Sequence, residues 1–453
     1  MTLTLPRPAP GPSIPWTWVF ARPAALALAL ALPLVPYLAP ATARAQGVTT
    51  GIQFVEAFNR ALGFYSRHEF EQAVEAFRAA LRLSPTDADA HLYLGNALMR
   101  AGRPEEAIPA FRRAIEYRYG FAEGYNNLGL AYQFTGQLDR AIAEFRRAVS
   151  FGVDYGEGHY NLGQAYLARG QVDRGVESLR EAVRLQPQAA RAHVALGTAL
   201  ARKGQLGEAG AALERAVRLR PEDADAHHHL GAVRARQGDP AAAAAAYREA
   251  LRRRPGDAAV LNDLAVAYGQ QGAYAEAAET LREALRAAPE FAEAHNNLGF
   301  TLRRLGRHEE AIAAYREAVR LRPDFSEGRA NLGVTLLAAG RPGEAVPELR
   351  EAVRLRPNFA EAHRHLGTAL LEQGEVGPAV AALERALELN PGYVQAHAAL
   401  AGTLERAGRI REARDQWSQV ISLAPQSPEA DQARRALDRL RPPLRRDATP
   451  PRP

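Results

Sequence analysis

Histidine is the residue type in this 453-residue chain whose spacing most suggests chemistry, because three occur in a row at His227-His228-His229. Imidazole nitrogens bind zinc and other transition metals. Consecutive helical residues point about 100° apart, however, so the three rings would not converge on one ion. His68-Glu69 and His308-Glu309 lack the second histidine of an H-E-x-x-H zinc motif. The chain has no Cys, which excludes thiolate metal sites and disulfides. We therefore predict no metal site.

Other catalytic motifs are also missing from the sequence. It contains no G-x-x-x-x-G-K-[ST] phosphate loop and no G-x-S-x-G nucleophile elbow. Outside the segments described below only Gln46–Gln53 remains, which is too short for a catalytic domain. We predict no catalytic residue and no cofactor, and hence a protein that is not an enzyme.

The histidines instead follow a repeat of 34 residues. Leu-Gly or Leu-Ala pairs begin at Leu94, Leu128, Leu162, Leu196, Leu230, Leu264, Leu298, Leu332, Leu366 and Leu400. Counted from six residues before each Leu, eleven repeats run from Phe54 to Ser427. Seven of the twelve histidines then share position 4: His91, His159, His193, His227, His295, His363 and His397. A fixed position in a repeat favours a helix–helix contact over a metal site.

Each repeat has the pattern of two packed helices. Position 8 is always Gly or Ala, and position 24 is always bulky, as in Gly95 with Phe111. Small residues let two helices approach, and the large one fills the space between them. Position 15 is Gly in ten repeats, which favours a helix C-cap, and position 32 is Pro in nine, which stops the second helix.

This pattern resembles the tetratricopeptide repeat over residues 54–427. The resemblance implies an all-α fold, a right-handed α-solenoid superhelix of tandem helix-turn-helix repeats. In that family the first helices line a concave groove that holds proteins or peptides. The sequence departs from the family pattern at Arg60 and His68 in the first repeat, as a capping repeat would. Residues 428–440 are predicted to form a C-terminal capping helix, and the Pro- and Arg-rich residues 441–453 a disordered tail.

Positions 2, 6, 9 and 13 lie opposite the packed face of the first helix, so we expect them to line this groove. Asn recurs at position 6 and resembles the asparagine ladder of protein O-linked N-acetylglucosamine transferases, which holds extended peptides. The alternative, weighed equally, is that these amides hydrogen-bond helix to helix. The candidate partner-binding residues are Asn59, Tyr93, Asn127, Phe134, Tyr160, Asn161, His229, Asn297, Asn331 and His365.

Acidic and aromatic residues add two further groove features. Position 2 is acidic in seven repeats: Asp89, Glu123, Glu157, Asp225, Glu293, Glu327 and Glu361. The favoured interpretation is the helix dipole, and if the stripe does face a ligand it would prefer a basic or polar segment. Eleven of the 33 aromatic residues lie between Tyr117 and Tyr166, in the repeats that lack Pro at position 32. They either bind a partner or fill the space in the more open loops of these repeats. If Tyr160 and Phe134 bind, Ala there should weaken capture and leave the melting temperature nearly unchanged.

The two ends of the chain carry its net charge. Residues 1–45 and 429–453 contribute +3 each, and the rest is neutral, so we predict no nucleic-acid partner. Residues 1–45 contain Arg22, an apolar run from Ala24 to Ala39, and the small-residue site Ala43-Arg44-Ala45. These are the parts of a secretory signal peptide, which we expect to be cleaved before Gln46. The alternative is an uncleaved anchor, the one case in which we expect a membrane contact.

We therefore expect an exported scaffold or adaptor, in the periplasm or cell envelope, that binds protein or peptide partners in its groove without catalysis. Two alternatives stay open: a substrate-binding arm for a separate glycosyltransferase, and a structural part of an envelope export or polysaccharide-secretion complex.

Overall fold

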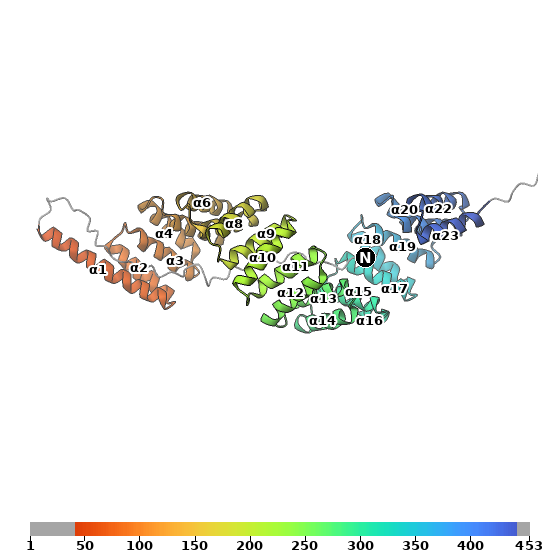
Figure 1. Ribbon diagram of the computed structural model, residues 1–453, viewed down its shortest axis with the longest axis horizontal. Coiled ribbons are helices and arrows are strands. Elements are labelled where there is room, and N and C mark those ends of the chain that lie inside the picture. The colour runs from red at the N-terminus through yellow and green to blue at the C-terminus, as the bar shows by residue number, and fades with distance from the viewer. Residues whose placement is uncertain (1–40, 442–453) are drawn as a thin grey trace, which may run out of the picture. The chain divides into compact units, whose positions relative to one another are not determined.

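The structure is a computed structural model that describes residues 41–441, with side chains from residue 49 onward. Over that range it contains 23 α-helices and no strand (Figure 1). Two compact units divide between Asp239 and Pro240. In each unit, helices pair antiparallel across a short turn, and successive pairs stack side by side (Figure 1). The predicted all-α solenoid of helix-turn-helix repeats is therefore confirmed.

The N-terminal unit holds six first helices and five second helices. The first helices are α1 (Ala41–Ser66), α3 (Ala88–Arg100), α5 (Ala122–Phe134), α7 (Gly156–Ala168), α9 (Ala190–Arg202) and α11 (Ala224–Arg236). The second helices are α2 (Phe70–Leu83), α4 (Pro104–Tyr117), α6 (Leu138–Phe151), α8 (Val172–Leu185) and α10 (Leu206–Leu219). From α3 onward each first helix begins at position 1 of its repeat, whereas α1 begins well before Phe54.

The C-terminal unit starts on a second helix. Its first helices are α13 (Ala258–Gln270), α15 (Ala292–Arg304), α17 (Ser326–Ala338), α19 (Ala360–Glu372) and α21 (Val394–Arg406). Its second helices are α12 (Pro240–Arg253), α14 (Tyr274–Ala287), α16 (His308–Leu321), α18 (Pro342–Leu355), α20 (Val376–Leu389) and α22 (Ile410–Leu423). The last helix is α23 (Pro428–Arg439), whose buried Ala433 and Ala436 pack with Trp417 of α22.

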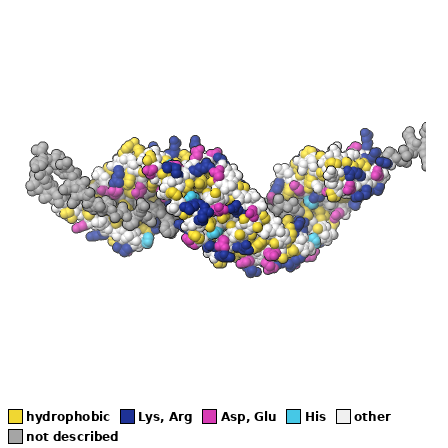
Figure 2. Space-filling model, in the orientation of Figure 1, with side chains coloured by type: hydrophobic (Ala, Val, Ile, Leu, Met, Phe, Trp, Pro, Cys, Tyr) yellow, Lys and Arg dark blue, Asp and Glu magenta, His cyan; other side chains and the backbone are white. Residues whose placement is uncertain are grey.

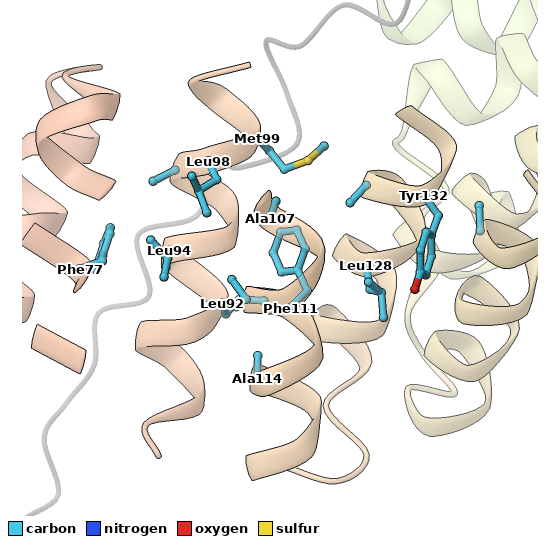
Figure 3. Packing of buried hydrophobic residues seen from close by; sticks show 14 of the residues in the cluster. Phe77, Leu92, Leu94, Leu98, Met99, Ala107, Phe111, Ala114, Leu128 and Tyr132 are labelled. Atoms are coloured by element: carbon cyan, nitrogen blue, oxygen red, sulfur yellow. The ribbon is translucent and has the colours of Figure 1, made fainter. Parts of the chain in front are cut away.

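The glycine at position 8 is needed because the large side chain at position 24 lies against it. A Cβ on Gly95 would lie 2.5 Å from the ring of Phe111, which is fully buried. Figure 3 shows this ring between side chains of α3 and Leu128 of α5. The same contact recurs in Gly129 with Phe145, Gly163 with Leu179, Gly197 with Leu213, Gly299 with Tyr315, Gly333 with Leu349 and Gly367 with Leu383. The predicted packing of small against large residues is confirmed.

The turns follow the expected chemistry. Each position-15 glycine from Gly102 to Gly408 has a φ between +72° and +84°, the left-handed region that side chains with a Cβ disfavour. In the first repeat His68 takes this conformation, with a φ of +63°.

The two ends of the chain extend beyond the described residues. The predicted signal apolar run Ala24–Ala39 and nearly all of the predicted tail lie outside the described residues, and the predicted cut before Gln46 falls inside α1. Among residues 41–441 no helix is long and apolar enough to cross a membrane.

Candidate binding groove on the first helices

The asparagines at position 6 join neighbouring first helices through their amides. In the N-terminal unit Nδ2 of Asn127 donates to Oδ1 of Asn96, and Nδ2 of Asn161 donates to Oδ1 of Asn126, both at 2.9 Å. In the C-terminal unit the matching bonds are Asn297 to Asn262 at 2.9 Å and Asn331 to Asn296 at 3.0 Å. All eight side chains are buried. The helix-to-helix interpretation of these amides thus has a structural basis, and contact with a ligand stays a prediction.

The partners of these amides are residues that the sequence did not single out. Asn126, Asn262 and Asn296 occupy position 5, and Asn96 occupies position 9. The doublets Asn126-Asn127 and Asn296-Asn297 could have revealed these bonds in the sequence. Two adjacent amides on one helix can each hydrogen-bond to a different neighbouring helix.

The other candidate residues divide by exposure. Asn59 and Phe134 are exposed, Phe134 by 50% of its surface. Tyr93, Tyr160, His229 and His365 are partly buried. The ten candidates are divided between the two units, and each lies on a first helix of its unit.

Tyr93 and Tyr160 both take part in packing. The Tyr93 ring lies 5.8 Å from that of Phe58 and 5.9 Å from that of Phe77. Tyr160 accepts a hydrogen bond from Nε2 of Gln164 at 3.3 Å, with the guanidinium of Arg191 4.9 Å from its ring centre. Burial raises the pKa of the Tyr160 hydroxyl. We now expect Tyr160→Ala to lower stability, unlike the sequence-based expectation.

The acidic stripe at position 2 is largely engaged by arginines. Asp89 pairs with Arg118 at 2.9 Å, and Glu293 and Glu327 pair with the arginine at position 31 of their own repeats. Each of these arginines also lies over the aromatic ring at position 34, as Arg118 does over Phe121 at 4.4 Å. These arginines were not among the candidate residues, although position 31 carries an arginine in five repeats: Arg118, Arg220, Arg254, Arg322 and Arg356. In these repeats the acid holds the loop that follows the second helix.

Six of the seven position-4 histidines hold the loops that precede their first helices. Nε2 of His91 lies 2.9 Å from the carbonyl oxygen of Pro85, six residues earlier. The same bond occurs at His193, His227, His295, His363 and His397. His227 is therefore a loop anchor. In the described part of the chain, no three His, Asp or Glu residues gather as a metal would require.

Two partly buried histidines face the first-helix surface at position 6. Burial and the neighbouring His228 lower the pKa of His229 to about 4. Burial, Arg364 and Arg303 lower the pKa of His365 to about 3. Both rings are therefore neutral near pH 7, and His365 can accept the N–H of Arg364, whose Nη2 lies 2.6 Å from its Nε2.

Aromatic residues in and beside the loops of the second and third repeats pack on one another but differ in exposure. Tyr119, which replaces the usual Pro, is 82% exposed and packs edge-on against Phe151 at 5.1 Å. Tyr125 is buried and stacks on the same Phe151 ring, with the ring centres 5.3 Å apart. Both tyrosines therefore contact the Phe151 ring, while most of the Tyr119 side chain stays exposed.

Family models match nearly all of the repeat region. Models described as tetratricopeptide repeat match residues 58–118, 292–325, 331–394 and 370–437. A further model, described as the C-terminal domain of cilia and flagella-associated protein 70, matches residues 119–303. No curated protein matches the chain.

Several solved structures are similar to parts of the chain. A crystal structure of MamA is 28% identical, covering 37% of this chain and 97% of its own, with a TM-score of 0.35. YrrB, described as a TPR protein with an unusual peptide-binding site, is 24% identical. The match covers 41% of this chain and 96% of YrrB, with a TM-score of 0.36. PilF of Pseudomonas aeruginosa is 25% identical. The match covers 48% of this chain and 98% of PilF, with a TM-score of 0.43. Because all three TM-scores lie below 0.5, the assignment rests on the family models. Together with the 34-residue period and the paired helices, these models show that the chain belongs to the tetratricopeptide repeat proteins.

Proposed function

We propose that this protein is an exported, non-catalytic scaffold that binds protein or peptide partners along its first helices. The observation that carries the proposal is the set of exposed polar and aromatic side chains on the first helices of each unit. Asn59, Glu123 and Phe134 belong to it in the N-terminal unit, and Glu361 belongs to it in the C-terminal unit. A half-exposed aromatic such as Phe134 offers rigid contact area, which binding hot spots favour.

The stacked repeats make this surface suitable for recognition. The helices beneath it are fixed by buried pairs such as Gly129 with Phe145, and the amides of Asn127 and Asn161 tie neighbours together. A preformed surface loses little conformational entropy when a partner binds.

Site-specific photo-crosslinking in the native cell tests the binding surface. A photoreactive amino acid at Phe134 or Glu123 should form a defined adduct with a partner. The matched control is the same group at Ala143, an exposed residue on the second helix α6 of that repeat. Equal adducts from Ala143, or none from the first-helix positions, would rule out the proposed surface.

Export is tested separately, because it rests on the sequence of residues 1–45. The intact mass of the purified protein should correspond to a chain that begins at Gln46. A protein that keeps Met1 and stays in the cytoplasmic fraction would contradict export without affecting the binding proposal.

A further inference from the structure

A hollow of about 500 Å³ lies in the C-terminal unit, between α14 and the turn that follows α15. Its apolar wall comes from Tyr268, Ala275, Ala278 and Leu305, and Leu305 is 39% exposed. On the face shown in Figure 2, apolar side chains are mixed with charged ones, so an apolar wall is a local feature of this pair of repeats. The volume lies within the range of about 300–1,000 Å³ that is usual for ligand pockets.

Leu305 stands where other repeats have a polar side chain that bridges to the preceding repeat. It occupies position 14, as Gln271 does one repeat earlier. Gln271 donates to the carbonyl oxygen of Pro240, on the second helix of the preceding repeat, at 3.0 Å. The aliphatic side chain of Leu305 cannot make such a bond. The equivalent bridges elsewhere are Gln237 to Leu206, Arg169 to Asp139 and Lys203 to Asp173.

A second bridge is also missing at this junction. Arg341, at position 16, pairs with Glu309 at position 18 of the preceding repeat, at 3.1 Å. Arg307 shares position 16, but the residue at position 18 of the preceding repeat is Ala275. Arg307 pairs instead with Glu310 of its own repeat, at 2.5 Å. The junction beside Leu305 therefore lacks both side chains that close this space in other repeats.

One charge on the wall of the hollow is unpaired. Arg282 pairs with Glu279 at 2.5 Å, and Arg307 is paired with Glu310. Among the described residues, none pairs with the carboxylate of Glu276, which also lines the hollow. The hollow thus combines an apolar wall with a free carboxylate. This combination suits a large apolar side chain that is followed by a basic residue.

The chain has such a sequence directly after its last helix, at Pro442-Pro443-Leu444-Arg445-Arg446. Three extended residues lead from Arg441, the last described residue, to Leu444 and span about 10 Å. That is about the diameter of one helix, whereas helices α17 to α22 stack in turn between α16 and α23. Leu444 is therefore too close to α23 to reach the hollow of its own chain, and a second copy must supply it.

We propose that the segment Leu444-Arg445-Arg446 of one copy binds the hollow beside Leu305 of another. Leu444 packs against the apolar wall, and an arginine that follows it pairs with Glu276. Because the segment and the hollow are different surfaces, the contact is head to tail and can repeat from copy to copy. It uses none of the residues assigned to partner binding, so this self-association goes beyond the proposed function.

Sedimentation velocity of the purified full chain tests this contact. The protein should form larger species as its concentration rises, and added salt should weaken the association. Leu444→Ala and Leu305→Gln should each weaken it by about tenfold or more, because each removes apolar contact area. Glu276→Gln should weaken it by a smaller factor. Gln fits position 14, as Gln271 shows, and circular dichroism checks that each variant is folded.

A mixture of two variants identifies the contact. The Leu444→Ala chain keeps its hollow and the Leu305→Gln chain keeps its segment, so an equimolar mixture should recover a dimer. The control is Leu423→Gln, which changes a leucine that is 42% exposed on α22 and should associate like the unchanged protein. An unchanged protein that stays monomeric, a mixture without dimer, or an equal loss in the control would overturn the proposal.

Discussion

The glycine at position 8 is the residue that most limits substitution in these repeats. Gly95 has no space for a Cβ, because the Phe111 ring fills it. We expect Gly95→Ala to lower the local free energy of unfolding by about 1–3 kcal/mol, since the ring must move within a packed core. Hydrogen exchange of the α3 and α4 amides measures this change.

Gly377 provides the matched control for that substitution. It lies on helix α20 with nothing within 4 Å of where its Cβ would be. Gly377→Ala should raise stability by up to about 1 kcal/mol, because Ala is the better helix former. If both variants behave alike, helix propensity and not packing decides the effect at position 8.

The asparagine amides make a second prediction at the residue scale. Asn331→Ala removes the donor to Oδ1 of Asn296 and should cost about 1–2 kcal/mol, as the loss of a buried hydrogen bond does. Asn59 shares position 6 but is exposed, so Asn59→Ala should change stability by less than about 0.5 kcal/mol. Hydrogen exchange of α17 and of α1 measures the two effects. A cost at Asn59 equal to that at Asn331 would contradict a packing role for the amides.

At the scale of the element, each second helix ends in a loop held by charged side chains. Arg356 pairs with Glu327 and lies 4.5 Å from the centre of the Phe359 ring. Arg356→Ala should therefore lower stability by about 1 kcal/mol, and by less at high salt. Thermal unfolding at low and high salt measures this loss.

Arg354 is the control for that loop, two residues away. It pairs only along its own helix with the side chain of Glu351, at 2.6 Å. An exposed pair of this kind contributes little to stability, because water screens the two charges. If Arg354→Ala lowers stability as much as Arg356→Ala does, the contacts of Arg356 with the loop contribute nothing beyond its charge.

The helices themselves were predictable from the sequence, but the contacts between their ends were not. Small and large residues at positions 8 and 24 have one packing solution, so Gly95 and Phe111 could be paired without a structure. The partner of Glu293 could not, because an acid in a first turn fits the helix dipole equally well. The same limit applied to Asn297: helix propensity does not reveal whether an amide faces a ligand or its neighbour.

At the scale of the whole molecule, repeats that contact mainly their neighbours are expected to unfold in parts. A chain that begins at Gln46 has one tryptophan, Trp417, which is 2% exposed and donates to Glu405 at 2.5 Å. In a urea titration its fluorescence should report the last repeats, while circular dichroism reports all helices. We expect the two curves not to coincide.

The Gly95→Ala variant sharpens this test. It should shift the circular dichroism curve and leave the Trp417 fluorescence curve in place, because the two sites lie in different units. Coincident curves that shift together would mean that the array unfolds as one cooperative body.

The contact between positions 8 and 24 is made within a single repeat, as Gly163 with Leu179 and Gly299 with Tyr315 show. A whole 34-residue segment can therefore be duplicated or lost while its own fit is preserved, whereas recombination between the two helices of a repeat would join a mismatched pair. The asparagine bonds add a second constraint, because Asn126 and Asn161 must be inherited together. Growth and shortening of such an array in evolution should thus proceed by complete segments, with the amide-linked neighbours copied as a block.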